Sequence, residues 1–232
     1  MSIGTFLKTQ RLIARAKKLR QACERHNGEV EAVLGAIRLQ SKFSLVQKRR
    51  EIAGLLERIK PLRPGIIVDI GSSGGGTIRL FSHFAADDAR ILSIDINNTP
   101  LRQQAFPHLV REGQSLNVYN GSSYDEKTVA FLKQWLNGEE IGLLFIDGDH
   151  EYDGVARDFR LYSPFVKEGG IVAFHDIVED YKTRFGRTTP AYVGEVPRFW
   201  REIRSQYPHA EELIQDPEQD GFGIGVIRWQ KN

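Results

Sequence analysis

The stretch FIDGDHEYDGVARDFRLYSPFVKEGGIVAFHDI, Phe145–Ile177, holds two apolar runs with a helical segment between them. The first run leads into Asp147 and His150, and the second leads into His175 and Asp176. Apolar runs with little polar alternation, joined by a helix, are typical of parallel strands that are buried on both faces. Because charged groups avoid buried strands unless something pairs with them, these four side chains are expected to share a partner.

The same rhythm continues on both sides of this stretch. The runs GIIVDIG (65–71), RILSIDI (90–96) and SLNVYNG (115–121) come before it, and residues 210–229 after it show two strand-like runs around a polar turn. Apolar residues at helical spacing predict helices over residues 5–60. We therefore predict an α/β fold with a doubly wound, mostly parallel sheet, an N-terminal helical extension and a C-terminal antiparallel hairpin.

The extension shows three apolar stripes. One ends near Asn27-Gly28, a short second stripe follows, and a third precedes Pro61 and Pro64, which cannot continue a helix. Ser44 and Gln47 have the spacing of a capping box, which predicts that the third helix begins there.

Composition narrows the class of protein. The hydrophobic content of 41% is ordinary for a globular protein, and no apolar run approaches the roughly 18 residues of a membrane span. Cys23 is the only cysteine, which excludes an intrachain disulfide and a multi-thiolate zinc site. We expect a soluble, cytoplasmic protein without a membrane partner.

Basic residues gather in the extension. Residues 1–60 carry fourteen Lys and Arg against five Asp and Glu. No aromatic residues lie between these bases as stacking on nucleic acid would favour, so we interpret them as the solvated face of a surface helix. The apolar faces of the same helices could form the interface of a homo-oligomer.

A glycine-rich turn follows the first predicted strand. The strand ends at Asp69, and Gly71 and Gly74–Gly76 precede a helix that starts at Thr77. Glycines let a ligand approach the backbone, but this spacing is neither a dinucleotide fingerprint nor a phosphate loop. A carboxylate before the turn would attract a cationic ligand rather than a phosphate.

The ends of the second and third predicted strands also carry residues that could bind a ligand. Asp95 lies where α/β nucleotide sites place the acid that binds ribose hydroxyls, and the turn of Gly121, Ser122 and Ser123 could edge an adenine. A nucleoside with a positively charged tail that is not a phosphate fits both turns. S-adenosylmethionine (SAM) has this chemistry.

Residues 45–230 resemble a class I SAM-dependent methyltransferase, through VDIGSSGGGT (68–77), Asp95 and the turn after the third strand. The resemblance implies a seven-stranded sheet whose last strand is reversed. We accordingly divide the chain into an extension (1–44) and a methyltransferase domain (45–232). The cofactor-binding residues that follow from the resemblance are Asp69, Gly71, Gly75, Thr77, Asp95, Ser122, Ser123 and Asp147.

The opening stretch has a second set of candidates. Two carboxylates that close neighbouring strands repel each other unless one takes a proton or a cation lies between them. A divalent cation is one answer. Magnesium prefers oxygen ligands, whereas His175 as a ligand would favour manganese or another transition metal. Alternatively, Asp147 could contact substrate without a metal and His175 could be a core histidine.

The pattern IDGDHEY…GG…HD resembles the metal-dependent O-methyltransferases, in the branch with macrolide and aminocoumarin sugar methyltransferases and cephalosporin-hydroxylase-like proteins. The resemblance implies that Asp147, His175 and Asp176 bind magnesium or manganese. It places the general base at Asp149 or His150, and we choose His150 because the ordinary pKa of a histidine is near neutral pH.

These features predict a SAM-dependent O-methyltransferase (EC 2.1.1.-), assisted by a divalent metal, that acts on a hydroxyl of a sugar, polyphenol or natural-product intermediate. The aperiodic residues 178–206 are expected to form a lid. Within it, Arg184, Arg187, Tyr192 and Trp200 are candidates for substrate contact or for loop packing. The alternatives are an RNA or protein methyltransferase that docks through the basic extension, and a non-catalytic interaction protein on the same fold.

Overall fold

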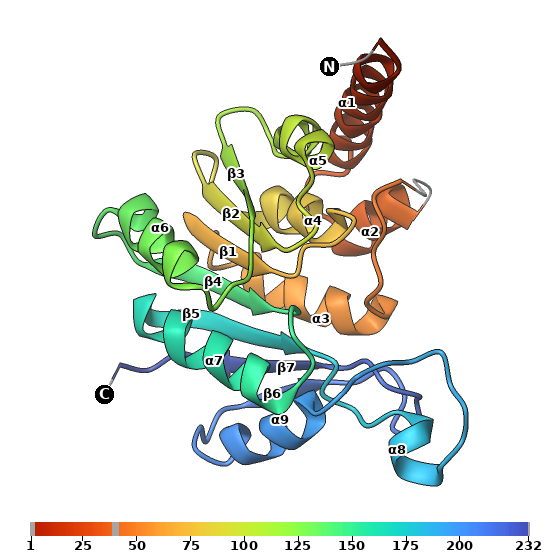
Figure 1. Ribbon diagram of the computed structural model, residues 1–232, viewed down its shortest axis with the longest axis vertical. Coiled ribbons are helices and arrows are strands. Elements are labelled where there is room, and N and C mark those ends of the chain that lie inside the picture. Colours follow the sequence, from red (N-terminus) through yellow and green to blue (C-terminus); the bar gives the residue numbers. More distant parts are fainter. Residues whose placement is uncertain (1–2, 39–41, 232) are drawn as a thin grey trace.

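The computed structural model describes residues 3–38 and 42–231. Its centre is a seven-stranded sheet in the order β3-β2-β1-β4-β5-β7-β6 (Figure 1). The strands are β1 (Ile66–Ile70), β2 (Arg90–Asp95), β3 (Ser115–Asn120), β4 (Ile141–Ile146), β5 (Val166–His175), β6 (Glu211–Leu213) and β7 (Ile224–Arg228). The first five strands run parallel, and β7 is antiparallel to both β5 and β6. The doubly wound sheet with its terminal hairpin is therefore confirmed.

Helices cover both faces of the sheet. They are α1 (Ile3–Glu24), α2 (Val30–Arg38), α3 (Arg49–Ile59), α4 (Gly76–Phe84), α5 (Pro100–Ala105), α6 (Glu126–Leu136), α7 (Tyr152–Tyr162), α8 (Tyr181–Phe185) and α9 (Val196–Arg204), with 3₁₀ turns at Phe106–His108 and Ser163–Phe165. Figure 1 shows α2, α3 and α4 on one side and α6, α7 and α9 on the other. No described helix is long and apolar enough to cross a membrane.

Each face of the sheet has its own apolar core. On one face, residues of α1 to α4 pack with Ile67, Phe145 and Ala173. On the opposite face, residues of α6, α7 and α9 pack with Leu144 and Phe174. Buried residues of α1 and α2, within the predicted N-terminal extension, therefore share a core with one face of the sheet.

The alternation of side chains along the strands decides which polar groups meet. Phe145 on β4 is in register with Ala173 on β5, and both lie in the core under α3 and α4. Because alternate residues of a strand share a face, Asp147 and His175, two positions further on, also point to that side of the sheet. On neighbouring β1, Asp69 is in register with Phe145 and follows Ile67 of the same core. Three titratable groups are thus brought to one face at the carboxyl edge.

The segment before α3 departs from the expectation. The helix begins at Arg49, and its N-cap residue Lys48 makes no side-chain capping bond. The capping box of Ser44 and Gln47 is therefore wrong: Ser44 packs against the glycine turn, and the Gln47 side chain is directed to Asp147. Long-range contacts outweigh the local capping pattern here.

Candidate active site

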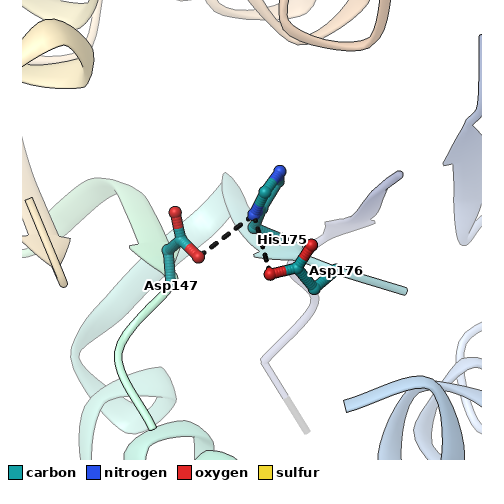
Figure 2. A group of neighbouring side chains, drawn as sticks. All are labelled: Asp147, His175 and Asp176. Carbon is teal, nitrogen blue, oxygen red and sulfur yellow. Dashed lines mark hydrogen bonds and ion pairs between the residues drawn. The ribbon is translucent and has the colours of Figure 1, made fainter. Parts of the chain in front are cut away.

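The carboxyl ends of β4 and β5 bring Asp147, His175 and Asp176 together, as Figure 2 shows. His175 Nδ1 is 3.1 Å from Asp147 Oδ1 and 3.2 Å from Asp176 Oδ2. One potential ligand atom from each residue lies within 4.8 Å of the other two. Among the described residues this is the group of acidic and histidine side chains that could hold a metal ion.

Asp176 has an unusual backbone conformation. Its φ is +63°, in the left-handed region that non-glycine residues rarely adopt, although Asp tolerates it better than most. The residue directly follows β5, so the turn aims its carboxylate back toward His175. Strained backbone of this kind tends to occur at functional sites.

The charges in this group balance one another. Burial by itself would lower the pKa of His175, but the carboxylates of Asp147 and Asp176 outweigh burial and raise it well above 6.5. Burial would raise the pKa of Asp147, but the positive charge of His175, its hydrogen bond and the nearby ring of His150 hold the pKa below 3.8. Two carboxylates therefore share one positive imidazole.

This arrangement fits a divalent cation. The donors converge on one point, and a cation there could replace the proton that His175 carries between the two carboxylates. Two carboxylate oxygens with one imidazole nitrogen are ligands suited to manganese or iron, and carboxylates with water also suit magnesium. Gln47 Nε2 donates to Asp147 Oδ2 at 2.8 Å, which leaves Oδ1 directed toward His175.

His150 lies beside the same group. Its Nδ1 is 2.8 Å from the backbone oxygen of Tyr192, and its ring stacks on the Tyr192 ring with a centroid distance of 5.6 Å. Its Nε2 is 3.8 Å from Asp147 Oδ1 and 3.6 Å from Asp176 Oδ2. Burial would lower the pKa of His150, but these two carboxylates outweigh it and raise the pKa above 6.5.

Asp149, the other candidate base, has a different environment. It accepts hydrogen bonds from the backbone N–H of Glu151 at 3.0 Å and from the Tyr124 hydroxyl at 3.0 Å. These contacts tie it to the start of α7. Of the two candidates, His150 is the one whose ring nitrogen faces the acidic group.

A cavity of about 570 Å³ opens next to this group. The predicted cofactor residues Gly71, Asp95, Ser122, Ser123 and Asp147 all line it, together with Asp149 and His150. Asp95 accepts backbone hydrogen bonds from Ser73 and Asn97 at 2.8 and 2.7 Å, so its carboxylate is fixed at the wall. Four carboxylates line the cavity, and none of its described lining residues is Lys or Arg.

Three of the predicted cofactor residues do not line this cavity. Asp69 is buried and accepts a hydrogen bond from Thr77 at 2.7 Å, while its other oxygen has no partner. Burial raises the pKa of Asp69 to about 7, which the Thr77 hydroxyl offsets only in part. Gly75, with φ of +83°, faces Phe106 and Leu109.

The glycines of this turn allow close packing within the chain, which the sequence analysis did not predict. A Cβ on Gly74 would lie 2.0 Å from Ser44 Oγ, and one on Gly76 would lie 2.4 Å from the Ser44 backbone oxygen. A Cβ on Gly71 would lie 1.9 Å from the backbone oxygen of Asp147. The absence of side chains at these glycines leaves room for Ser44 and Asp147 of the same chain, so the number of glycines is not by itself evidence for a ligand.

The predicted lid is in part a core element. Trp200 on α9 is buried, and its Nε1 donates to Glu212 at 2.7 Å, so of its two candidate roles the structure supports packing. Arg184 pairs with Glu218 at 2.9 Å, and Arg187 lies over the Phe185 ring. Tyr192 alone of the four candidates lines the cavity.

Gln47 is the site residue that sequence reasoning missed. It lies 100 positions before Asp147, and its amide gives no chemical signal of its own in the sequence. The local pattern around it matched a capping box instead.

Residues 68–177 match a family described as "Methyltransferase domain". An uncharacterised protein of Acanthamoeba polyphaga mimivirus is 47% identical over 70 residues, which make up 30% of this chain and 30% of that protein. The chain thus matches less than a third of the length of this curated relative.

Solved structures with the same fold include O-methyltransferases. One from Bacillus cereus, in complex with SAH, is 16% identical with a TM-score of 0.56 over 85% of this chain and 90% of its own. TomG from Streptomyces achromogenes, an O-methyltransferase of tomaymycin synthesis, is 15% identical with a TM-score of 0.51 over 93% and 90%. MycE of the mycinamycin pathway, in complex with Mg and SAH, is 16% identical with a TM-score of 0.51 over 75% and 47%.

The sheet order, the cavity at its carboxyl edge and the matched residues 68–177 agree with one another. The chain therefore has the class I methyltransferase fold, and its residues 68–177 are similar to a methyltransferase domain.

Proposed function

We propose that the protein is a SAM-dependent O-methyltransferase that uses a divalent cation to methylate a hydroxyl group of a small molecule. The observation that carries this proposal is the Asp147, His175 and Asp176 group at the edge of the cavity, with His150 Nε2 beside it. MycE has the same fold and is described with Mg and SAH, which is a precedent for a cation beside this cofactor.

Different cavity residues would bind different parts of SAM. Asp95 would accept hydrogen bonds from the ribose hydroxyls, and Ser122 and Ser123 would edge the adenine. The sulfonium of SAM is positive, so the carboxylates along the wall favour it electrostatically. Because four carboxylates but no Lys or Arg among the described residues line the cavity, an acceptor with phosphate or carboxylate groups would be disfavoured electrostatically. This supports a neutral or positively charged polyol and argues against RNA.

The reaction follows from this geometry. A cation held by Asp147, His175 and Asp176 would supply positive charge that acidifies a neighbouring hydroxyl. His150 Nε2 takes the hydroxyl proton, while its Nδ1 is held by the Tyr192 backbone oxygen. The acceptor oxygen attacks the methyl carbon, the carbon–sulfur bond breaks, and its electron pair remains on sulfur. The products are a methyl ether, a neutral thioether and a proton on His150.

The test is methyl transfer from SAM to a panel of catechols, sugars and RNA, with chelator-treated protein and after adding Mn²⁺ or Mg²⁺. We expect turnover of a neutral diol or polyol only when metal is present. Asp176→Asn should lose most of that turnover, since Asn tolerates the left-handed backbone but lacks the charge. Asp88→Asn on the surface is the control. Full turnover by chelator-treated protein would refute the metal mechanism, and methylation of RNA alone would refute the acceptor class.

A further inference from the structure

Gln47 lies just before α3, in a segment that contacts both the glycine turn and the end of β4. The segment that carries it crosses from the glycine turn, where Ser44 packs against Gly74 and Gly76, to the end of β4, where Gln47 meets Asp147. Gln47 is only 3% exposed although its side chain is polar, so its hydrogen bonds decide its orientation.

The hydrogen bond from Gln47 fixes one side of the Asp147 carboxylate. Gln47 Nε2 donates to Asp147 Oδ2 at 2.8 Å, and His175 Nδ1 approaches Asp147 Oδ1 at 3.1 Å. The reverse orientation of the amide would place its oxygen against the carboxylate, which is repulsive. The amide therefore holds Oδ2 away from the ligand group and leaves Oδ1 as the atom that faces His175 and Asp176.

We propose that Gln47 is a positioning residue for the metal site: it orients Asp147 so that a single carboxylate oxygen faces the cation. This inference rests on the metal-assisted function proposed above. It also couples the segment before α3 to the reaction centre, although that segment lies outside the matched residues 68–177.

The position of Gln47 makes a larger effect on the metal site than on folding the expected result of replacing it. Its Oε1 is buried without a hydrogen-bond partner, so the side chain contributes one hydrogen bond and one unsatisfied acceptor to the folded state. Replacing Gln47 with an apolar side chain removes this unsatisfied acceptor but also takes the donor from Asp147 Oδ2, so some loss of stability is expected. Groups that orient metal ligands, in contrast, typically affect metal affinity 10- to 100-fold.

The experiment titrates MnCl₂ calorimetrically into chelator-treated full-length protein, comparing wild type with Gln47→Leu and Gln47→Met. We expect both variants to bind Mn²⁺ roughly 10- to 100-fold more weakly. Binding of SAH, titrated without metal, should stay close to wild type, and the thermal midpoint should fall only modestly, because Asp147 Oδ2 loses its donor. Val46→Ala, an exposed neighbour in the same segment, is the matched control and should change neither affinity.

The outcomes separate this inference from the proposed function. If wild type binds Mn²⁺ and both Gln47 variants bind it equally well, the positioning role is wrong while the metal mechanism stands. If the variants lose SAH and Mn²⁺ binding to the same degree, Gln47 acts through the general shape of the site, and the proposal also fails. Absence of Mn²⁺ binding to wild type would overturn both proposals.

Discussion

Asp158 on α7 is a buried carboxyl group that has only partial hydrogen bonding. Its Oδ1 accepts from the Ser123 hydroxyl, and its Oδ2 has no partner. Burial raises its pKa from 3.8 to about 7, with a smaller contribution from the charge of Asp149. Because Ser123 lines the cavity, this carboxyl supports the cavity wall through the Ser123 hydroxyl.

The raised pKa of Asp158 predicts a pH-dependent stability. A carboxyl that ionises near 3.8 in the unfolded chain but near 7 in the folded protein contributes fully below pH 3.8, and this contribution is lost as the pH rises through about 7. Asp158→Asn cannot ionise. Its free energy of unfolding, relative to wild type, should therefore increase between pH 4 and pH 7, by an amount on the order of 3 kcal/mol.

Urea unfolding at several pH values measures this difference. Asp153→Asn, on the exposed side of the same helix, is the control for removing a charge from α7. A constant difference between Asp158→Asn and wild type across this pH range would show that Asp158 is ionised when folded.

The strands and helices followed from the sequence because each depends on neighbouring residues. The apolar runs predicted β1 to β5 and the terminal hairpin, and helical spacing predicted α1 to α3. The carboxyl-edge rule for parallel sheets then brought Asp147 and His175 together. The features that the sequence did not predict depend on contacts distant in sequence: the Gln47 amide on Asp147, and Ser44 against the glycine turn.

The glycine turn before α4 can be interpreted as a loop that admits a ligand or as a site of close packing against Ser44, and a substitution at Gly74 distinguishes the two. If Gly74 serves to admit a ligand, Gly74→Ala should weaken SAH binding and leave the stability of the ligand-free protein unchanged. The structure predicts instead a loss of about 1–3 kcal/mol in the free energy of unfolding, since the new Cβ would meet Ser44 at 2.0 Å. Adding Ser44→Ala removes the nearest atom and should restore part of this loss.

Denaturant unfolding without cofactor is the measurement. Gly65→Ala is the matched control, because a Cβ there meets nothing within 4 Å. If Gly74→Ala were as stable as wild type but bound SAH more weakly, the turn would instead be a loop that admits a ligand.

At the scale of the whole molecule, the N-terminal helices could unfold separately from the sheet or together with it. Leu19 of α1 is fully buried in the core that also contains Phe81 of α4 and Phe145 of β4. One continuous core would couple the unfolding of α1 to that of the sheet. Leu7, on the same helix, is 48% exposed and makes a matched control for shortening a leucine.

We propose that the N-terminal helices and the sheet unfold together. Leu19→Ala should then lower the free energy of unfolding by about 2–5 kcal/mol in one cooperative transition, because it leaves a cavity in the shared core. Leu7→Ala should change it by no more than about 0.5 kcal/mol. Urea unfolding followed by both far-ultraviolet circular dichroism and tryptophan fluorescence distinguishes the cases, since all three tryptophans lie after residue 134. If Leu19→Ala shifted only the helical signal and left the fluorescence transition in place, α1 would be a separable appendage.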